Sequence, residues 1–289
     1  MNFQYIIVLM LFIIFIFIFG LIIGSFLNVV ILRYGADESF SKGKSKCLKC
    51  GKTLKWFELI PVLSFIIQKG RCRTCQSKIS WQYPIVELLT GIIFALVFLK
   101  IWNLEFVWKL EIVNLMPDYL LLFGIIFYWW TIFSFLIVIS VYDIRHQIIP
   151  NEFVYPLIII SLFAPIFQVW NLEFVWKLEI GNFKILLSYI LSGFALYSFF
   201  ALLWLVSLGR AMGYGDAKLA LAMGFFLGPF KSVIAFLFSF WFGAAFGISL
   251  IIFSKGKIGL KSQIPFGPFL ALGAFLAFLA EINIFQILL

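Results

Sequence analysis

The sequence predicts an all-α, polytopic integral membrane protein with about eight transmembrane helices and one small soluble segment. Hydrophobic residues make up 64% of the chain and charged residues only 12%, whereas a soluble domain carries roughly 25% charged residues. The apolar residues fall in long continuous runs, and about 20 such residues in a row span a bilayer as a helix. The alternating pattern of a transmembrane β-barrel is absent from the sequence.

Each apolar run is bounded by short polar turns, as expected for helices whose backbone groups bond internally in lipid. Pro84, Pro150 and Pro268 stand at the starts of the second, fourth and last runs, where proline removes no helical hydrogen bond. The runs cover approximately residues 5–32, 84–101, 119–142, 148–168, 183–208, 217–229, 232–254 and 266–289.

The polar stretch 33–83 divides the chain into a first helix (1–32), a soluble segment (33–83) and a helical membrane domain (84–289). This stretch holds eleven of the 22 basic residues. Because cytoplasmic loops carry the excess of Lys and Arg, residues 33–83 are predicted to be cytoplasmic and both termini to lie outside. The lipid bilayer accounts for the net charge of +9, so no nucleic-acid partner is expected.

All four cysteines lie in this soluble segment, as two CxxC pairs separated by 21 residues: Cys47, Cys50, Cys72 and Cys75. The spacing is typical of a tetrahedral site with four thiolate ligands, and zinc is the predicted metal. A cytoplasmic location disfavours two disulfides, which are the alternative together with free thiols. Four thiolates leave no open coordination position, so the zinc is predicted to be structural.

Asp143 and Asp216 are the candidate catalytic residues. Each stands where a long apolar run meets a short polar turn, and a carboxylate at a membrane edge is costly unless it has a partner or a purpose. Two at equivalent depth predict a pair that shares one proton, as in aspartic proteases. The alternatives are that Asp143 pairs with Arg145 or Lys218, and that Asp216 caps a helix beginning at Ala217.

Further polar positions border these features. Gly213 and Gly215 flank Asp216 and indicate unusual backbone torsions or a close approach by another segment. Glu87 near the start of the second run fits either a favourable interaction with the helix dipole or a role in a site. The first run ends in small and polar residues that suit close helix contact: Gly24, Ser25, Asn28 and Arg33.

An eleven-residue segment, 102–112, recurs identically as 170–180. Its Trp and Lys residues among apolar ones suit the headgroup zone of a membrane, which predicts two short interfacial segments. Duplication explains the identity, and we expect no catalytic role.

These motifs together resemble the bacterial prepilin peptidases, or type IV leader peptidases, of the GxGD aspartic protease group. The resemblance covers almost the whole chain. It is carried by residues 24–33, the four cysteines, residues 84–87, Asp143 with Ile149 and Pro150, residues 213–218 and residues 265–270.

The resemblance implies an enzyme of the bacterial inner membrane that cleaves the short basic leader from type IV prepilins or type II secretion pseudopilins. It also implies methylation of the new N-terminal residue, with S-adenosylmethionine as donor. Asp143 and Asp216 would then be the protease pair, supported by Gly213, Gly215 and Lys218. The cysteine segment is associated with methylation, and Gly24, Ser25, Asn28, Arg33 and Glu87 border it as a candidate methyltransferase or substrate region.

Two alternatives remain at this point. A peptidase-only enzyme would keep the aspartates and lack methyl transfer, and the sequence contains no Rossmann glycine fingerprint for S-adenosylmethionine. A proton-coupled transporter would use paired carboxylates as a relay, but it leaves the cysteine segment without a purpose. The sequence gives no indication of the oligomeric state.

Overall fold

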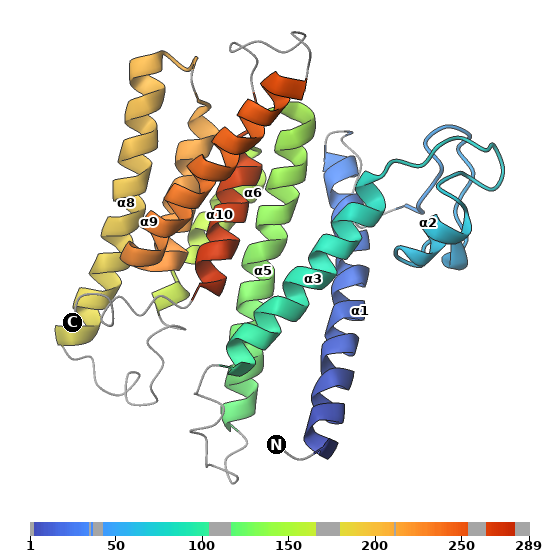
Figure 1. Cartoon of the computed structure of the whole chain (residues 1–289), viewed down its shortest axis with the longest axis horizontal. Coiled ribbons are helices and arrows are strands. Elements are labelled where there is room, and N and C mark those ends of the chain that lie inside the picture. The colour runs from blue at the N-terminus through green and yellow to red at the C-terminus, as the bar shows by residue number, and fades with distance from the viewer. Residues whose placement is uncertain are drawn as a thin grey trace. The chain divides into compact units, whose positions relative to one another are not determined.

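The computed structural model describes residues 3–34, 36, 43–103, 117–165, 180–210, 212–253 and 264–280. Most of these residues are helical, and the described part of the chain contains no strand beyond two isolated antiparallel bridges, so the predicted all-α class is confirmed. The elements are α1 (Phe3–Tyr34), η1 (Trp56–Glu58), α2 (Leu63–Ile67), α3 (Gln82–Asn103), α5 (Pro117–His146), α6 (Asn151–Ser161), α8 (Ile180–Ser207), α9 (Tyr214–Phe253) and α10 (Gly267–Leu279) (Figure 1).

The chain packs as two compact units, residues 1–134 and 135–289. This division by contacts does not test the predicted boundaries at residues 33 and 83, which separate the soluble cysteine segment from the membrane helices. Those boundaries stay a prediction. Each unit is built around its own helix contacts, so the two are described in turn.

In the first unit, α1 and α3 lie side by side (Figure 1) at two glycine contacts. A Cβ on Gly20 would lie 2.7 Å from the Cα of Gly91, and a Cβ on Gly24 would lie 2.7 Å from the Cα of Glu87. Small residues at these positions let the two backbones approach closely. The N-terminal part of α5 joins α3 through Trp130, whose indole N–H donates to the carbonyl of Phe94 at 3.1 Å.

In the second unit, α9 is the central element and contacts α6, α8 and α10. A side chain at Gly224 would collide with the backbone of Gly193 on α8, and the Ser192 hydroxyl donates to the Gly224 carbonyl at 2.8 Å. On its other side, α9 leaves no room for a side chain at Gly273 of α10. Such close contacts through small residues are typical of membrane helices, whose association depends on van der Waals packing rather than on the hydrophobic effect.

Helix α9 is interrupted at Gly228, which has a positive φ of 74° with ψ −179° and precedes Pro229. A side chain at Gly228 would meet the ring of Tyr189, so glycine is required for both conformation and space. The interruption separates the two apolar runs predicted at 217–229 and 232–254. With α9 counted as two parts, the described helices account for the eight predicted runs.

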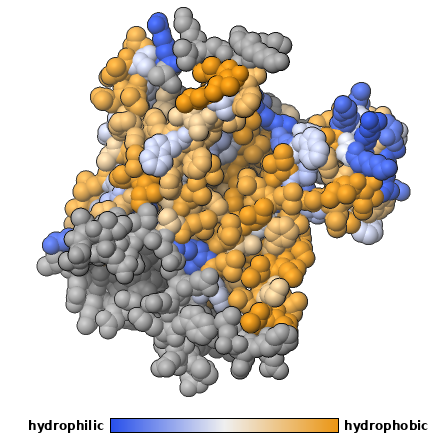
Figure 2. Space-filling model, in the orientation of Figure 1, coloured by the Kyte–Doolittle hydropathy of each residue, from blue (hydrophilic) through white to orange (hydrophobic). Residues whose placement is uncertain are grey.

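Five of the described helices are long and apolar enough to cross a membrane: Ile6–Tyr34, Gln82–Trp102, Leu122–His146, Phe183–Ser207 and Tyr214–Phe253. Helices α6 and α10 are shorter apolar helices, and α6 covers less than the predicted run 148–168. Figure 2 shows apolar residues covering much of the helical surface. The protein is therefore a multi-pass membrane protein.

The repeated segments 102–112 and 170–180 lie almost wholly outside the described residues. Trp102 and Asn103 end α3, and Ile180 begins α8. The predicted interfacial segments therefore stay a prediction.

Candidate functional site

Two buried carboxyl groups lie in the second unit, on different helices. Asp143 stands in the last turn of α5 and is 4% exposed, and Asp216 stands in the first turn of α9 and is 6% exposed. The two groups are close enough for their charges to interact. Segments 73 residues apart in the sequence thus bring both candidate catalytic residues into one site.

The carboxyl group of Asp143 is held by the start of α10. Its Oδ2 accepts a hydrogen bond of 2.9 Å from the backbone N–H of Gly267. A Cβ on Gly267 would lie 2.8 Å from the same oxygen, so only glycine lets the carboxylate approach this closely. The alternative of a surface ion pair is not observed, because Asp143 is buried and Lys218 bonds other residues.

Asp216 is the third residue of α9, which begins at Tyr214 rather than at Ala217. Its Oδ2 accepts a hydrogen bond of 3.2 Å from the backbone N–H of Gly213, the residue before the helix. This bond is the acidic half of a capping box. The predicted capping role therefore holds in a modified form, and it does not by itself explain why the carboxyl group is buried.

Of the two glycines of the turn, only Gly215 lies where an added Cβ would collide with another segment. A Cβ on Gly215 would lie 2.7 Å from the Cβ of Ile149, so Gly215 permits the close approach that the sequence indicated. Neither Gly213 nor Gly215 has a positive φ, so unusual torsions are not the cause.

Lys218 lies beside this turn and is held by α6. Its ammonium group donates to the side-chain oxygen of Asn151 at 2.7 Å and to the hydroxyl of Tyr155 at 3.1 Å. It also lies 5.1 Å from the ring centre of Tyr214, within cation–π range. Lys218 therefore fastens the start of α9 to the start of α6, which fixes the backbone that carries Asp216.

Each aspartate accepts one backbone N–H through Oδ2, and among the described residues no further hydrogen bond reaches either carboxyl group. The remaining oxygens are available to a water molecule or a substrate carbonyl. Two neighbouring carboxylates ionise together only at high cost, so the pair favours one shared proton. Such a pair can act as general acid and general base at once.

The four cysteines form a second cluster, in the first unit. Their sulfur atoms all lie within 4.8 Å of one another, and the Sγ atoms of Cys47 and Cys75 are 3.8 Å apart. Zinc–sulfur bonds of about 2.3 Å in a tetrahedron place sulfur atoms about 3.8 Å apart. The geometry therefore fits a four-thiolate metal site, and none of these cysteines is in a disulfide.

The two CxxC pairs have matching backbone turns. Cys47 N–H donates to Lys52 and Cys72 N–H donates to Ser77, each at 2.9 Å. Gly51 and Gln76, which follow the two pairs, both have positive φ, 71° and 56°. Gln76 therefore adopts the same left-handed turn as Gly51, although its side chain makes this conformation less favourable.

The turns also prepare the thiols for a metal. Backbone N–H groups of Cys50 and Lys49 lower the pKa of Cys47 to about 6, and the Ser77 hydroxyl lowers the pKa of Cys75. The Lys52 N–H acts to lower the pKa of Cys50, but desolvation and the neighbouring thiols outweigh it and raise that pKa to about 11. The two turns therefore favour the thiolate forms of Cys47 and Cys75, the forms that bind a metal.

A third group of polar residues joins α1 to the start of α3. Asn28 is 1% exposed, donates to the carbonyl of Tyr83 at 3.2 Å and accepts from Gln82. Glu87 is also buried, with 6% of its surface exposed. Arg33 donates instead to the carbonyl of Gly43 at 3.2 Å.

Glu87 also accepts a 2.7 Å hydrogen bond from the backbone N–H of Val62. It is the sixth residue of α3, which has no acidic residue in its first turn, so the helix-dipole explanation is wrong. The carboxylate instead ties the cysteine segment to the membrane helices.

Several contacts of these sites were not apparent from the sequence. The bond from Gly267 to Asp143 joins residues 124 positions apart. From the sequence, Pro268 indicated only the start of the last helix, and nothing indicated that Gly267 beside it holds Asp143. Lys218 bonds Asn151 and Tyr155. The sequence contained no indication of these two contacts beyond the position of Asn151 directly after Pro150.

The fold and these sites define a class: a polytopic helical membrane protein with a buried aspartate pair and a four-thiolate segment. Residues 18–101 match the Bacterial Peptidase A24 N-terminal domain, and residues 130–248 match the Type IV leader peptidase family. This chain belongs to the type IV leader peptidase family.

The sequences of individual relatives align with this chain over most of their length. The prepilin leader peptidase/N-methyltransferase of Bacillus subtilis is 33% identical over 263 residues, which is 91% of this chain and 92% of that protein. The type 4 prepilin-like proteins leader peptide-processing enzyme of Escherichia coli is 32% identical over 275 residues, 88% of each chain. The prepilin leader peptidase/N-methyltransferase of Pseudomonas aeruginosa is 29% identical over 283 residues, 90% of this chain and 87% of that protein. No solved structure matches the chain significantly.

Proposed function

We propose that this protein removes the leader peptide from prepilin-like precursors, with Asp143 and Asp216 as its catalytic residues. The observation that carries the proposal is the pair of buried, mutually interacting carboxyl groups at the ends of α5 and α9. Membership of the type IV leader peptidase family supports the same reaction. Type IV prepilins and type II secretion pseudopilins are the proposed substrates.

The chemistry follows from the shared proton. The ionised carboxylate accepts a proton from a water molecule, which attacks the scissile carbonyl carbon. The protonated partner donates its proton to the carbonyl oxygen, and collapse of the tetrahedral intermediate then releases the amine, protonated by the pair. The bonds from Gly213 and Gly267 hold one oxygen of each group, and we propose that the other oxygen of each group acts on the water molecule and the substrate. We assign neither aspartate as the base, because a coupled pair titrates as a unit.

We also propose that the protein methylates the new N-terminal residue, as the names of its relatives state for them. S-adenosylmethionine is the proposed donor, and it would supply an electrophilic methyl group. The Glu87 carboxylate already accepts a hydrogen bond from the Val62 N–H, so this region by itself does not form a complete site for the donor. Gly24, Ser25, Asn28, Arg33 and Glu87 remain the proposed methyltransferase or substrate region.

Zinc is the proposed metal of the four-cysteine cluster, held by Cys47, Cys50, Cys72 and Cys75. The sulfur spacing supports a tetrahedral ion. Because all four positions would be filled by thiolates, the ion would hold the two CxxC turns together rather than take part in cleavage.

The proposed location is the bacterial inner membrane, with residues 33–83 in the cytoplasm and both termini outside. The excess of basic residues in 33–83 supports this orientation. A precursor with a basic leader would keep that leader on the same side, so that the scissile bond lies at the membrane edge.

A reconstitution experiment tests the proposed function. The purified protein is incubated in detergent with a synthetic prepilin, with and without S-adenosylmethionine, and the product masses are measured. We expect loss of the leader in both reactions and addition of one methyl group only with the donor. Cleavage without methylation would support a peptidase-only enzyme, and no cleavage would contradict the proposal.

A further inference from the structure

We propose that α2 and the basic residues that follow it form a docking face, which seats the four-cysteine segment on an anionic lipid surface. The docking face consists of Leu63, Ile66, Ile67, Lys69, Arg71 and Arg73.

The apolar half of the docking face is one side of α2. Leu63, Ile66 and Ile67 are 56%, 63% and 65% exposed, and their spacing places them on the same side of a helix. The opposite side is anchored by Phe65, whose ring centre lies 4.9 Å from that of Trp81. The helix therefore packs through one side and presents three large apolar side chains outward.

The start of α2 is fixed at membrane depth. Val62 N–H donates to the Glu87 carboxylate at 2.7 Å, and Glu87 is the sixth residue of α3, which spans the membrane from Gln82. Five residues of helix correspond to about 7.5 Å along its axis. The start of α2 thus lies level with the first turns of α3, a candidate membrane span whose end is expected near the headgroup zone.

The backbone at this point is unusually constrained. Val62 has φ 60° and ψ −51°, and Leu63 N–H donates to the Pro61 carbonyl at 2.6 Å. These values describe the rarer, positive-φ form of the γ-turn, which is strained for a β-branched residue. The buried Glu87 carboxylate stabilises this turn, so the depth of α2 is set by a specific contact.

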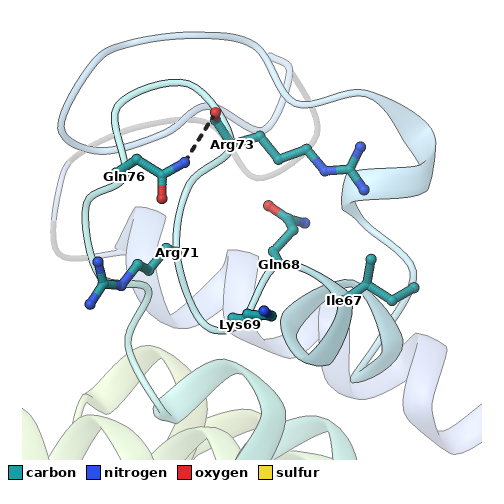
Figure 3. A pocket seen from close by; sticks show the side chains of 6 residues that line it. All are labelled: Ile67, Gln68, Lys69, Arg71, Arg73 and Gln76. Carbon is teal, nitrogen blue, oxygen red and sulfur yellow. Dashed lines mark hydrogen bonds between the residues drawn. The ribbon is translucent and has the colours of Figure 1, made fainter.

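Charge completes the face. An open hollow of about 780 Å³ lies beside α2, and its lining includes Ile67 and the three basic residues Lys69, Arg71 and Arg73. Figure 3 shows the Arg71 and Arg73 guanidinium groups pointing away from each other, so they do not converge on a single small ion. Exposed cations spread beside apolar anchors are typical of binding to anionic headgroups.

An exposed tryptophan of the same segment supports lipid as the occupant. Trp56 is 78% exposed, and tryptophan is enriched where protein meets the headgroup zone. The contact of α2 with the start of a candidate membrane span, the exposed apolar side chains and the positive charge are together the features expected of a bilayer-binding surface.

Photo-crosslinking in the full-length protein tests this inference. A photoreactive benzoylphenylalanine replaces Ile67 or, as a matched control in the same segment, Leu48, which is 77% exposed. The protein is placed in nanodiscs of phosphatidylcholine with or without phosphatidylglycerol, and adducts are identified by mass spectrometry. We expect severalfold more lipid adduct from position 67 than from position 48, and most with phosphatidylglycerol. Equal adducts at both positions, or adducts to a second protein copy, would overturn the inference.

Charge variants separate specific from general attraction. Replacing all three basic residues of the docking face by Gln is expected to lower the lipid adduct at position 67 severalfold. A control removes the same charge elsewhere in the segment, at Lys44, Lys49 and Lys78. An equal fall in both variants would overturn the basic part of the face. Unchanged metal content in each variant shows that the segment is still folded.

Discussion

Gly267 illustrates how a residue without a side chain can determine the position of a carboxyl group. Its N–H holds Asp143 at 2.9 Å, and an added Cβ would lie 2.8 Å from the same oxygen. Asp143 and Asp216 are both buried, so the surrounding protein limits how far either carboxyl group can move. Small displacements within such a pair are expected to cost much of its activity.

Gly267→Ala should therefore lower the rate of leader cleavage at least about tenfold, because the carboxylate must move away from its hydrogen-bond donor. The rate is measured on a synthetic prepilin under single-turnover conditions. Gly124→Ala is the matched control, since no atom lies within 4 Å of a Cβ placed there. Equal activity of the two variants would show that the Gly267 contact does not position Asp143.

At the scale of elements, the two CxxC turns are separately organised units that a metal would join. Each has its own backbone hydrogen bonds and its own left-handed residue. The thiols of Cys47 and Cys75 have lowered pKa values, whereas that of Cys50 is raised. Metal binding should therefore release the proton of Cys50 and depend on the ionisation of Cys47.

The purified protein should contain about one zinc ion per chain at pH 8 and lose it on acidification through pH 6. The loss of metal at low pH follows from the pKa of its ligands. The pKa of Cys47 is lowered to about 6, so this thiol is ionised above that pH. Below that pH, protons compete with the metal for the sulfur. Metal content is measured after dialysis against a weak chelator. Cys50→Ser should lose the metal at every pH, whereas Leu48→Ala should retain it. Full retention by wild type at pH 5 would contradict this account.

For the whole molecule, the division into two units has a functional consequence. The aspartate pair and its supporting turn lie within residues 135–289, and the cysteines lie within residues 1–134. Damage to the cysteine cluster should therefore spare the protease chemistry more than any activity that depends on the first unit.

A variant with all four cysteines replaced by Ser should keep leader cleavage within a few-fold of wild type and lose methyl transfer by about a hundredfold or more, a scale set by lost positioning. Cleavage is followed by gel shift and methylation by transfer of radiolabel from S-adenosylmethionine. Parallel loss of both activities would indicate that the segment supports the whole fold, and retained methylation would separate it from that reaction.

The sequence predicted much of this molecule because membrane helices and CxxC pairs are local patterns. Eight apolar runs correspond to the described helical parts, and both CxxC pairs meet in one cluster. Long-range contacts were not predictable in this way. The Gly267–Asp143 bond and the Val62–Glu87 bond join distant segments, and Glu87 was given a local explanation that the structure does not support. The start of α9 at Tyr214 was also missed. An aspartate can bond a helix start either as the residue just before the helix or from within its first turn, and the sequence does not distinguish the two positions.

The central claim is that Asp143 and Asp216 together perform the cleavage, and removal of either ionisable group tests it most directly. Asn preserves size but cannot share the proton, so Asp143→Asn and Asp216→Asn should each lower cleavage about a thousandfold or more. Both variants should retain the zinc content and thermal stability of wild type. Normal cleavage by either folded variant would show that the carboxyl group only supports the structure, and would contradict the proposed mechanism.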